Sequence, residues 1–309
     1  MEKNQVAAVV VTYNRLPLLE KCIESLCAQT AACDILVVNN ASTDGTTPWL
    51  ENQEKTHILT TRNTGSNLGG AGGFHFGMRW AVEDGYQYLW IMDDDCLPEP
   101  DALEKLLKAD RLLDGNYGWL SSQCRWTDGS LCPMNIQRKS PYRAIEGFDD
   151  ALVPAQMASF VSLFLKAETV KRMGLPISEF VIWTDDWEYT RRISLKMKCY
   201  AVRDSVVMHA MKKKTVVNIA TDSPDRLKRY SYFYRNDVVL YRREGLKGWL
   251  WLLAKDCWHS AQVIGHGRPK RLPVIWKGFV SGIMFKPQEM QAPFEYQIPS
   301  ERAEHPAAK

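Results

Sequence analysis

The chain has 309 residues, of which 45% are hydrophobic and 24% charged, the composition of a globular protein with one large domain or two ordinary ones. A net charge of +3 excludes a protein that coats nucleic acid along its whole surface. The charge is uneven, because residues 212–271 hold 14 Lys and Arg against 5 Asp and Glu. An acidic body followed by a basic segment predicts a negatively charged partner for the C-terminal part.

Eight cysteines are scattered along the chain, and no two have the C-x-x-C spacing of zinc ligands. We therefore expect free thiols and a reducing compartment, the cytoplasm. The first residues, MEKNQVAAVVVTYNR, do not have the pattern of a signal peptide. No apolar run approaches the roughly 20 residues of a membrane span, and the best candidate, residues 249–254, stops at Lys255-Asp256.

The first half of the chain alternates apolar, β-rich runs with patterns of helical spacing. The expected strands are residues 6–12, 34–39, 57–60 and 86–92. The expected helices are residues 16–29, 48–53, 69–83 and 100–113. This order predicts an α/β fold with a parallel sheet between two layers of helices. Ligands bind such sheets beyond the carboxyl ends of the strands, where the polar motifs of this half lie.

The pattern is less regular after Gly118. The expected strands are residues 156–165, 200–203 and 206–209, and helices are expected to end at Met173 and near Lys196. Two more helices are expected at about residues 226–243 and 246–264. We therefore expect an α/β domain over residues 1–215, a helical, basic and aromatic region over 216–290, and a loose tail over 291–309.

Asp93, Asp94 and Asp95 follow the apolar strand YQYLWIM. Adjacent carboxylates repel one another, and a divalent cation would compensate for that repulsion. Mg²⁺ and Mn²⁺ prefer oxygen ligands and are often shared with phosphates. The alternative is a solvated turn that caps the helix after Pro100, for which one aspartate would suffice.

Two other strand ends carry polar side chains suited to a nucleotide. The first group is Thr12, Tyr13, Asn14 and Arg15, and the second is Asn39, Asn40, Ser42 and Asp44. Their side chains could bind a base and ribose, and Arg15 could bind a phosphate. Ordinary capping of the following helices is the alternative.

Five glycines lie within the nine residues from Gly65 to Gly73, directly before an amphipathic helix. Glycine lets the backbone approach a ligand closely, and a helix N-terminus favours anions. The segment lacks the G-x-G-x-x-G spacing of a dinucleotide site. It therefore indicates a binding loop of another kind, with a flexible turn as the alternative.

The motif WTDDWE at residues 183–188 places three carboxylates at a helix start among aromatic side chains. Such an aspartate can act as a general base, or it can merely oppose the helix dipole. His209 ends a strand and is followed by Lys212, Lys213 and Lys214. A metal-bound, phosphate-bearing ligand would explain both features, although a lone histidine is more often structural.

The C-terminal region mixes arginines and lysines with many tyrosines and tryptophans. This composition fits a helix that lies on an anionic membrane. It also fits an amphipathic helix that packs on the core and exposes a basic face.

Taken in order, these motifs resemble the glycosyltransferase family 2 pattern on a GT-A fold. The matching segments, spread over residues 6–210, are VVVTYNR, NNASTDGT, NTGSNLGGAGG, WIMDDDCLPEP, WTDDWE and VVMHA. The combination of GGAGGF, DDD, WxDDxE and a later histidine is most similar to bacterial galactofuranosyltransferases, which use UDP-galactofuranose. Rhamnosyltransferases, which use dTDP-rhamnose, share much of the pattern.

The resemblance implies roles for individual positions. Asp93, Asp95 and His209 would hold Mn²⁺ or Mg²⁺, Asp186 would be the base, and Trp183, Asp185 and Glu188 would hold the acceptor sugar. The donor nucleotide would be bound by Thr12, Tyr13, Asn14, Arg15, Asn40, Asn67, Gly70, Asp93 and Asp94. The family often has Asp at position 39 or 40 to accept from the uracil imide, whereas both are Asn here.

These roles imply an inverting hexosyltransferase that uses a nucleotide-sugar donor. The acceptor hydroxyl attacks the anomeric carbon while Asp186 takes its proton. The implied acceptor is a lipid-linked bacterial surface glycan, such as O-antigen or cell-wall galactan, reached from the inner face of the cell membrane by a peripheral protein. Nucleic acid is not expected as a partner.

Two other hypotheses remain open at this stage. A nucleotidyltransferase needs an Asp pair but not WxDDxE, and it releases pyrophosphate. A non-catalytic lipid- or nucleic-acid-binding protein would use the basic segment alone.

Overall fold

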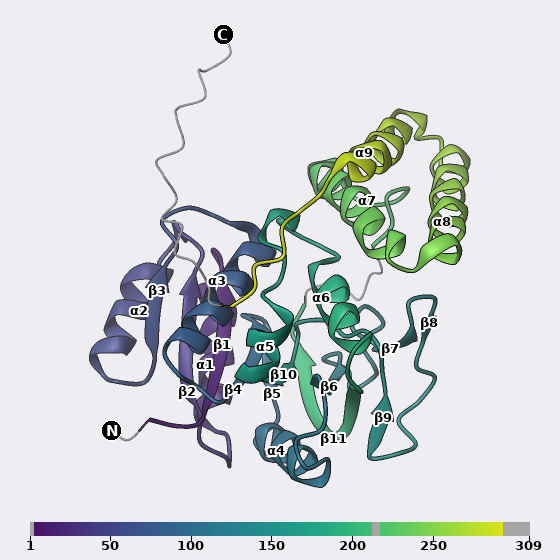
Figure 1. Ribbon diagram of the computed structural model, residues 1–309. Helices are drawn as coiled ribbons and strands as arrows, with labels where there is room; N and C mark the ends of the chain where they lie inside the picture. Colours follow the sequence, from purple (N-terminus) through teal and green to yellow (C-terminus); the bar gives the residue numbers. More distant parts are fainter. Residues whose placement is uncertain (1–2, 212–216, 293–309) are drawn as a thin grey trace.

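The computed structural model describes residues 3–211 and 217–292 and contains a mixed nine-stranded sheet with helices packed against it (Figure 1). The strand order is β3-β2-β1-β4-β10-β6-β11-β5, and β9 also pairs with β11. The strands are β1 (Val6–Thr12), β2 (Asp34–Asn39), β3 (Thr60–Asn63), β4 (Tyr88–Asp93), β5 (Cys96–Pro98), β6 (Leu120–Arg125), β9 (Leu152–Pro154), β10 (Leu163–Lys166) and β11 (Tyr200–His209). A separate two-stranded ribbon consists of β7 (Arg138–Ser140) and β8 (Arg143–Ala144).

The sheet is parallel in its first half and mixed in its second. Strands β3, β2, β1 and β4 are parallel, as the alternation of strands and helices predicts. Strand β10 is antiparallel to β4 and β6, whereas β11 is parallel to β6 and antiparallel to β5 and β9. The expectation of a mostly parallel α/β sheet is therefore confirmed.

Central strand β1 is buried along its whole length, which explains its continuous apolar sequence. Alternate side chains enter two cores, so that Val10 packs with α1 (Leu16–Cys27) and α4 (Ala102–Leu112) on one side. Val9 packs on the other side with α3 (Gly69–Glu83), α5 (Ala167–Met173) and α6 (Asp185–Ser194). The remaining helix of this half, α2 (Thr46–Lys55), follows β2.

Some of the glycines of the Gly-rich segment serve packing. A Cβ atom on Gly73 would lie 2.5 Å from Cγ1 of Val11, and one on Gly77 would lie 2.6 Å from Cγ1 of Val9. Helix α3 therefore approaches β1 more closely than side chains would allow. This contact accounts for part of the glycine content that also suggested a binding loop.

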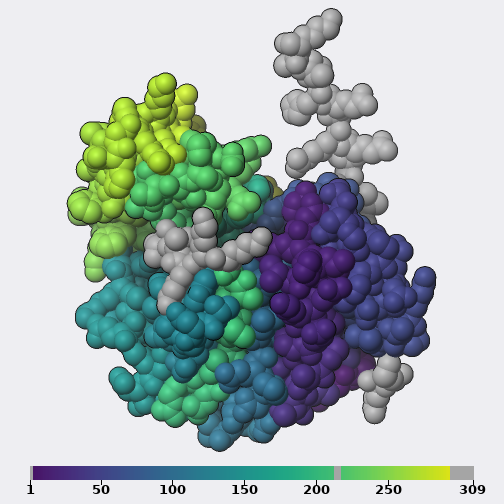
Figure 2. Space-filling model, turned by 180° about the vertical axis from the view of Figure 1, so that it is seen from behind, coloured from purple at the N-terminus to yellow at the C-terminus, as the bar shows by residue number. Residues whose placement is uncertain are grey.

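Three helices form a C-terminal lobe: α7 (Leu227–Arg242), α8 (Gly245–Gly265) and α9 (Leu272–Met284). Short 3₁₀ turns lie at η1 (Ser178–Phe180), η2 (Pro224–Arg226) and η3 (Pro269–Arg271). The lobe lies over one end of the sheet, above the half of the molecule that holds β6 and β11 (Figures 1 and 2). Gly282 lets α9 pack tightly on α7, because a Cβ there would lie 2.6 Å from Cβ of Val238.

Several predicted elements differ from the observed ones. The third strand lies at β3 rather than residues 57–60, because His57 and Ile58 turn back to bond the last residues of α2. Only the end of the strand expected at 156–165 is a strand, β10, and the two strands expected at 200–209 are one strand with an irregular register after Val202. Strands β5 and β6 and helix α9 were not predicted.

No described helix is long and apolar enough to cross a membrane. The expected domain boundary at residues 215 and 216, and all but the first two residues of the expected tail, lie outside the described residues.

Candidate active site

Asp94, the middle residue of the aspartate triplet, bonds to the end of β1. It is 3% exposed, and its carboxylate accepts hydrogen bonds from Thr12 Oγ1 at 2.8 Å and from Arg15 Nη1 at 3.3 Å. Burial raises the pKa of Asp94 to about 6, although the positive charge of Arg15 opposes the shift. The triplet is therefore not a solvated helix cap, and Asp94 and Thr12 bond to each other inside the protein.

Asp95 and His209 form a second buried pair. His209 Nε2 lies 3.0 Å from Asp95 Oδ1, and Arg15 Nη1 lies 2.8 Å from Asp95 Oδ2. Burial lowers the pKa of His209, but hydrogen bonds to Asp95 and Cys132, together with the negative charges of Asp95 and Asp93, outweigh it and raise the pKa to about 10. The antiparallel pairing of β11 with β5, which sets His209 opposite Cys96, brings these two distant residues together.

Asn135 orients the His209 ring, and no sequence motif points to this residue. Its Oδ1 lies 2.9 Å from His209 Nδ1, while its Nδ2 donates to Ser159 Oγ at 2.9 Å. An amide oxygen only accepts, so Nδ1 carries a proton and Nε2 is the nitrogen that faces Asp95. Asn135 is therefore a positioning residue for a histidine ligand.

Asp93 is the half-exposed member of the triplet and ends β4. Burial raises its pKa to about 7, and repulsion by Asp95 adds to the shift, while His209 and Arg15 oppose it. The cluster therefore keeps an excess of negative charge that a divalent cation would neutralise. Carboxylate oxygens together with one imidazole are a donor set that suits Mn²⁺.

The ligand atoms of Asp93, Asp95 and His209 are not gathered as tightly as in a formed metal centre. Within residues 3–211 and 217–292, the one set of three His, Cys, Asp or Glu ligand atoms lying within 4.8 Å of one another is Cys124, Cys132 and His209. A cation shared by Asp93, Asp95 and His209 would have to draw Asp93 toward the other two.

Asn14 joins the ends of β1 and β2. It adopts a left-handed backbone with φ of 54°, its Oδ1 accepts from Thr43 N at 2.7 Å, and its own N donates to Ser42 Oγ at 3.0 Å. It does not cap α1, since that helix has no side-chain cap. Beside it, Tyr13 is 40% exposed.

Asn40 shapes the Gly-rich loop from within. Its Nδ2 donates to Gly69 O at 2.9 Å and to Asn67 Oδ1 at 3.2 Å, and its Oδ1 accepts from Leu68 N at 2.9 Å. With a further bond from Thr64 Oγ1, these contacts occupy both ends of a side chain that is 2% exposed. The structure therefore gives Asn40 an internal role, whereas a Cβ on Gly70 would meet only open space.

The loop before α6 is backbone-strained and lies against the Gly-rich loop. Val181, Trp183 and Thr184 have φ of 66°, 63° and 69°. Such left-handed conformations are unfavourable for these residues and persist only where the surroundings enforce them. Val181 O accepts from Ala71 N at 3.2 Å, and a Cβ on Gly69 would lie 2.2 Å from that oxygen.

Helix α7 holds this strained loop in place. Asn236 Nδ2 donates to the backbone oxygens of Trp183 at 2.9 Å and Phe180 at 3.0 Å, and Thr184 Oγ1 donates to Asp237 Oδ1 at 2.7 Å. Asn236 and Asp237 are both buried. The C-terminal lobe is thus bonded directly to the candidate catalytic loop, which the sequence did not reveal.

Asp185 and Asp186 begin α6. Burial raises the pKa of Asp185 to about 6. Burial, with repulsion from Asp185, raises the pKa of the half-buried Asp186 well above its usual range, and the charge of Asp93 contributes to the same shift. The carboxylates of two motifs far apart in sequence therefore act on each other within one site.

Glu188 has other partners than an acceptor. Its side chain is fully buried and lies 3.1 Å from Arg192 Nε and 2.9 Å from Arg243 Nη1. A doubly paired, buried carboxylate is a structural ion pair. In the structure, Glu188 therefore joins α6 to α7 rather than facing the site.

The start of α7 adds two arginines that the sequence suggested only as membrane contacts. Arg226 lies 5.4 Å from the ring centre of Trp183, whose ring is 5.1 Å from that of Tyr230. Burial and repulsion from Arg226 and Arg15 lower the pKa of Arg229. The positive charges of Arg15, Arg226 and Arg229 therefore repel one another. The three lysines at 212–214 lie outside the described residues.

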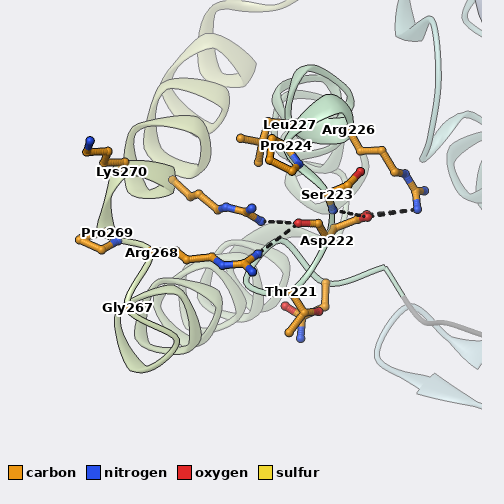
Figure 3. Close-up of a pocket in the computed structure, with 12 residues that line it drawn as sticks. Thr221, Asp222, Ser223, Pro224, Arg226, Leu227, Gly267, Arg268, Pro269 and Lys270 are labelled. Carbon is orange, nitrogen blue, oxygen red and sulfur yellow. Dashed lines mark hydrogen bonds and ion pairs between the residues drawn. The ribbon is translucent and has the colours of Figure 1, made fainter.

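A cavity of about 1020 Å³ lies next to these arginines, between the start of α7 and the α8–α9 connection (Figure 3). Asp222 is its central acid, with its carboxylate 3.1 Å from Arg226 Nη1 and its backbone oxygen accepting from Arg268 and Arg271. Lys270 adds a further cation to the lining. The cavity is therefore basic on several sides.

Comparison with known proteins identifies the domain. Residues 7–114 match the profile of glycosyl transferase family 2. An undecaprenyl-phosphate mannosyltransferase of Micrococcus luteus is 36% identical over 114 residues, which are 36% of this chain and 46% of the relative. Galactofuranosyltransferase GlfT1 of Mycobacterium tuberculosis is 30% identical over 194 residues, which are 61% of this chain and 64% of that protein. The chain thus spans less than two thirds of either relative.

A solved structure agrees on the fold. Mannosyltransferase PcManGT from Pyrobaculum calidifontis, solved with GDP-Man and Mn²⁺, aligns with a TM-score of 0.53 at 17% identity. The alignment covers 92% of this chain and 76% of the other. At this identity the likeness establishes the GT-A fold.

Proposed function

We propose that this chain, which carries a glycosyl transferase family 2 domain at residues 7–114 on a GT-A fold, is an inverting, metal-dependent glycosyltransferase. The observation that carries the proposal is the buried cluster in which Asp95 bonds both His209 and Arg15. Asp186, which starts α6, is the proposed acidic group on the acceptor side.

Asp186 is the proposed base. Its raised pKa makes it a stronger proton acceptor than an exposed aspartate. The acceptor hydroxyl loses its proton to Asp186 as its oxygen bonds to the anomeric carbon, and the bond from that carbon to the nucleoside diphosphate breaks. One displacement of this kind inverts the anomeric configuration.

The leaving diphosphate needs positive charge. A divalent cation held by Asp93, Asp95 and His209 would supply Lewis-acid stabilisation when bound. Arg15, which bonds Asp94 and Asp95, and the arginines at the start of α7, Arg226 and Arg229, are proposed to supply the protein's own positive charge. With Tyr13, Asn67 and Gly70, Arg15 forms the proposed donor site. Trp183 and Asp185 border the acceptor side.

UDP-galactofuranose is the proposed donor. Support comes from the length of the alignments, which extend over 194 residues with a galactofuranosyltransferase and over 114 with a mannosyltransferase. Asn39 and Asn40 are buried and bond within the protein. Other groups would therefore have to recognise the uracil ring of the donor. A rhamnosyltransferase that uses dTDP-rhamnose is the alternative within the same mechanism.

A donor screen tests the proposal. The full chain is incubated with UDP-galactofuranose, UDP-galactopyranose or dTDP-rhamnose, with and without Mn²⁺, and the nucleotide products are identified. We expect UDP release from UDP-galactofuranose that depends on Mn²⁺. Release of pyrophosphate would instead identify a nucleotidyltransferase, and turnover that is independent of the cation would remove the metal from the proposal.

The proposed acceptor is a lipid-linked glycan at the inner face of the cell membrane. Support comes from an apolar surface of α8 and α9 beside the basic cavity, described in the Discussion. The proposed domain arrangement follows from the same contacts: residues 1–215 form the catalytic domain, and residues 216–290 brace its catalytic loop and face the membrane.

A further inference from the structure

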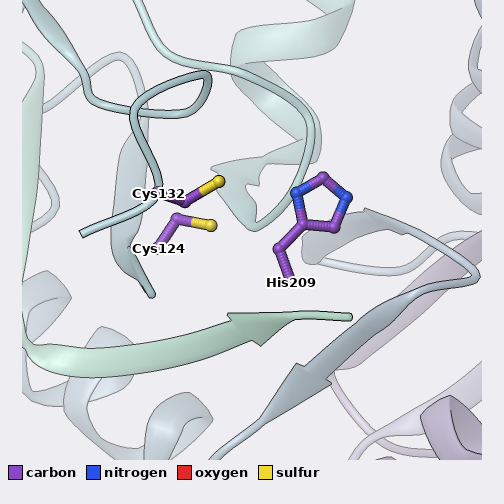
Figure 4. Close-up of side chains that lie close together, drawn as sticks. All are labelled: Cys124, Cys132 and His209. Atoms are coloured by element: carbon purple, nitrogen blue, oxygen red, sulfur yellow. The ribbon is translucent and has the colours of Figure 1, made fainter. Parts of the chain in front are cut away.

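Two cysteines and a histidine meet in the interior beside the candidate active site (Figure 4). Cys124, Cys132 and His209 are all buried, and their ligand atoms lie within 4.8 Å of one another. Both sulfur atoms point toward the side on which the imidazole lies (Figure 4). The wide sequence spacing of these residues gave no sign of a metal site.

The sheet itself creates this cluster. After β6 the chain turns and returns antiparallel, with Arg125 bridged to Leu131 and Cys132 N bonded to Cys124 O at 3.0 Å. Cys124 and Cys132 therefore lie directly opposite each other. Strand β11 pairs Val207 with Cys124, and side chains alternate along a strand, so His209 points to the same side as Cys124.

We propose that Cys124, Cys132 and His209 form a binding site for a soft divalent cation, for which Zn²⁺ is the best fit. Thiolates and imidazole are the ligands that Zn²⁺ prefers, and three protein ligands leave its fourth position to water. Zinc–sulfur bonds of about 2.3 Å in tetrahedral geometry separate the ligand atoms by roughly 3.5–3.8 Å. Atoms already within 4.8 Å need to close by only about 1 Å.

This site would compete with the proposed catalytic cation, a consequence that rests on the proposed function. His209 belongs to both ligand sets, and Asn135 connects them, because its Oδ1 lies 3.0 Å from Cys132 Sγ and 2.9 Å from His209 Nδ1. The thiols lie on the Nδ1 side of the ring, so a soft cation bound to them takes Nδ1 in place of Asn135. Closing that site shifts the ring, and its Nε2 moves away from Asp95. Zn²⁺ then acts as an inhibitor of Mn²⁺-dependent donor binding.

The binding step is tested on the full chain with its accessible thiols removed by Cys27→Ser, Cys33→Ser and Cys257→Ser. The protein is dialysed against Cd²⁺ or Zn²⁺ with a phosphine reductant, and the bound metal is measured. We expect one tightly bound equivalent that is lost when Cys124→Ser and Cys132→Ser are added. Cys199→Ser, a buried thiol in the other core, is the matched control and should retain it. Retention of the equivalent in the Cys124→Ser/Cys132→Ser protein would overturn the proposal.

The competition step has a separate measurement. UDP binding is titrated with Mn²⁺, with and without one equivalent of Zn²⁺, in the background protein and in the added Cys124→Ser/Cys132→Ser variant. We expect Zn²⁺ to weaken UDP binding at least tenfold in the background and not in the variant. Equal inhibition of both proteins would show that Zn²⁺ acts at the carboxylates and would overturn the sharing of His209. Absence of UDP binding without Zn²⁺ would count against the proposed function while the measured metal stoichiometry still decides the thiol site.

Discussion

The Asp186 carboxylate accepts the backbone N–H of Trp187 at 2.7 Å, and its pKa is raised by burial and by Asp185. Asp186→Asn keeps the shape of the side chain and removes its ability to take a proton. We expect transfer to fall by roughly 10²–10⁴-fold, the usual contribution of a general base. Calorimetric titration of UDP with Mn²⁺ should give an unchanged affinity, because the acceptor side is altered and the donor side is not. A loss of UDP binding in folded Asp186→Asn protein would reject this assignment.

A variant at Asp95 tests the donor side in the same way as Asp186→Asn tests the acceptor side. Asp95→Ala removes a carboxylate that bonds both Arg15 and His209. We expect Mn²⁺-dependent UDP affinity to fall by at least roughly 10–100-fold, the loss typical of a damaged metal shell. An unchanged UDP–Mn²⁺ titration would show that the cation does not use Asp95. The two variants together separate proton transfer from donor binding.

Within the elements, Gly69 connects the donor loop to the catalytic loop. It has φ of +76°, and a Cβ there would lie 2.2 Å from Val181 O. Gly69→Ala should therefore lower the free energy of unfolding by roughly 1–3 kcal/mol, because it adds both backbone strain and overpacking. Gly70→Ala is the control, since a Cβ at Gly70 meets nothing within 4 Å. Urea unfolding of the two variants checks this, and equal stability would show that the loops do not need this contact.

Asp256 gives α8 a pH-dependent stability. It is fully buried, its carboxylate accepts no hydrogen bond within the described part of the chain, and Lys255 Nζ lies 3.6 Å away. Burial raises its pKa from 3.8 to about 7. Between these values the folded state keeps a proton that the unfolded state has released, so stability falls as pH rises through this range.

Asp256→Asn should therefore stabilise the protein at about pH 8 by roughly 1–4 kcal/mol, from the shift of about three pKa units, and change little at about pH 4. Thermal unfolding at several pH values measures this. Asp225→Asn, at an exposed position on η2, is the control. If Asp256→Asn lowers stability at high pH, the carboxylate is instead a needed partner of Lys255.

The helices and strands were predicted correctly where the apolar residues of the sequence are the ones buried in the fold. Strands β1 and β2 have the expected bounds because both are apolar and buried, and α3 begins and ends as expected. Strand β3, TTRN, is a polar edge strand whose only strand partner in the described sheet is β2, so hydrophobicity misplaced it. Strand β6 was missed because it buries hydroxyl groups: Ser122 Oγ lies 2.7 Å from Oγ of both Ser162 and Ser205.

The sequence motifs located the site but did not distinguish the roles of its residues. Asp94 and Asp95 are equally buried and share Arg15, yet Asp94 also bonds Thr12 and Asp95 also bonds His209. Glu188 looked like Asp186 in the first turn of α6 and is instead held by two arginines. Asn135 and Asn236 act through contacts across the fold, and a single isolated asparagine carries no pattern that would reveal them.

Across the whole molecule, the C-terminal lobe has two different faces. Its inner face is packed and polar where it meets the catalytic loop, through Asn236 and Asp237 of α7. Its outer face exposes large apolar side chains at helical spacing: Leu246, Leu250, Leu253 and Trp258 on α8, and Trp276, Val280, Ile283 and Met284 on α9. The packing hypothesis therefore holds for the inner face, and the membrane hypothesis stays a prediction for the outer face.

The outer face of the lobe leads to the last prediction, that the protein binds anionic membranes through α8. Leu250 is 60% and Trp258 63% exposed. Burying one such side chain in a lipid interface contributes about 1.5–3 kcal/mol.

We expect the full chain to float with vesicles that contain anionic lipid, less so at high salt, which screens the basic residues. Leu250→Glu with Trp258→Glu should weaken vesicle binding more than tenfold. Leu112→Glu, at a site 67% exposed on α4, should not. If the wild-type chain does not float with the vesicles, the membrane prediction is wrong and the apolar face is a candidate surface for a protein partner. If Leu112→Glu weakens vesicle binding as much as the α8 variant does, net charge and not the apolar face governs binding.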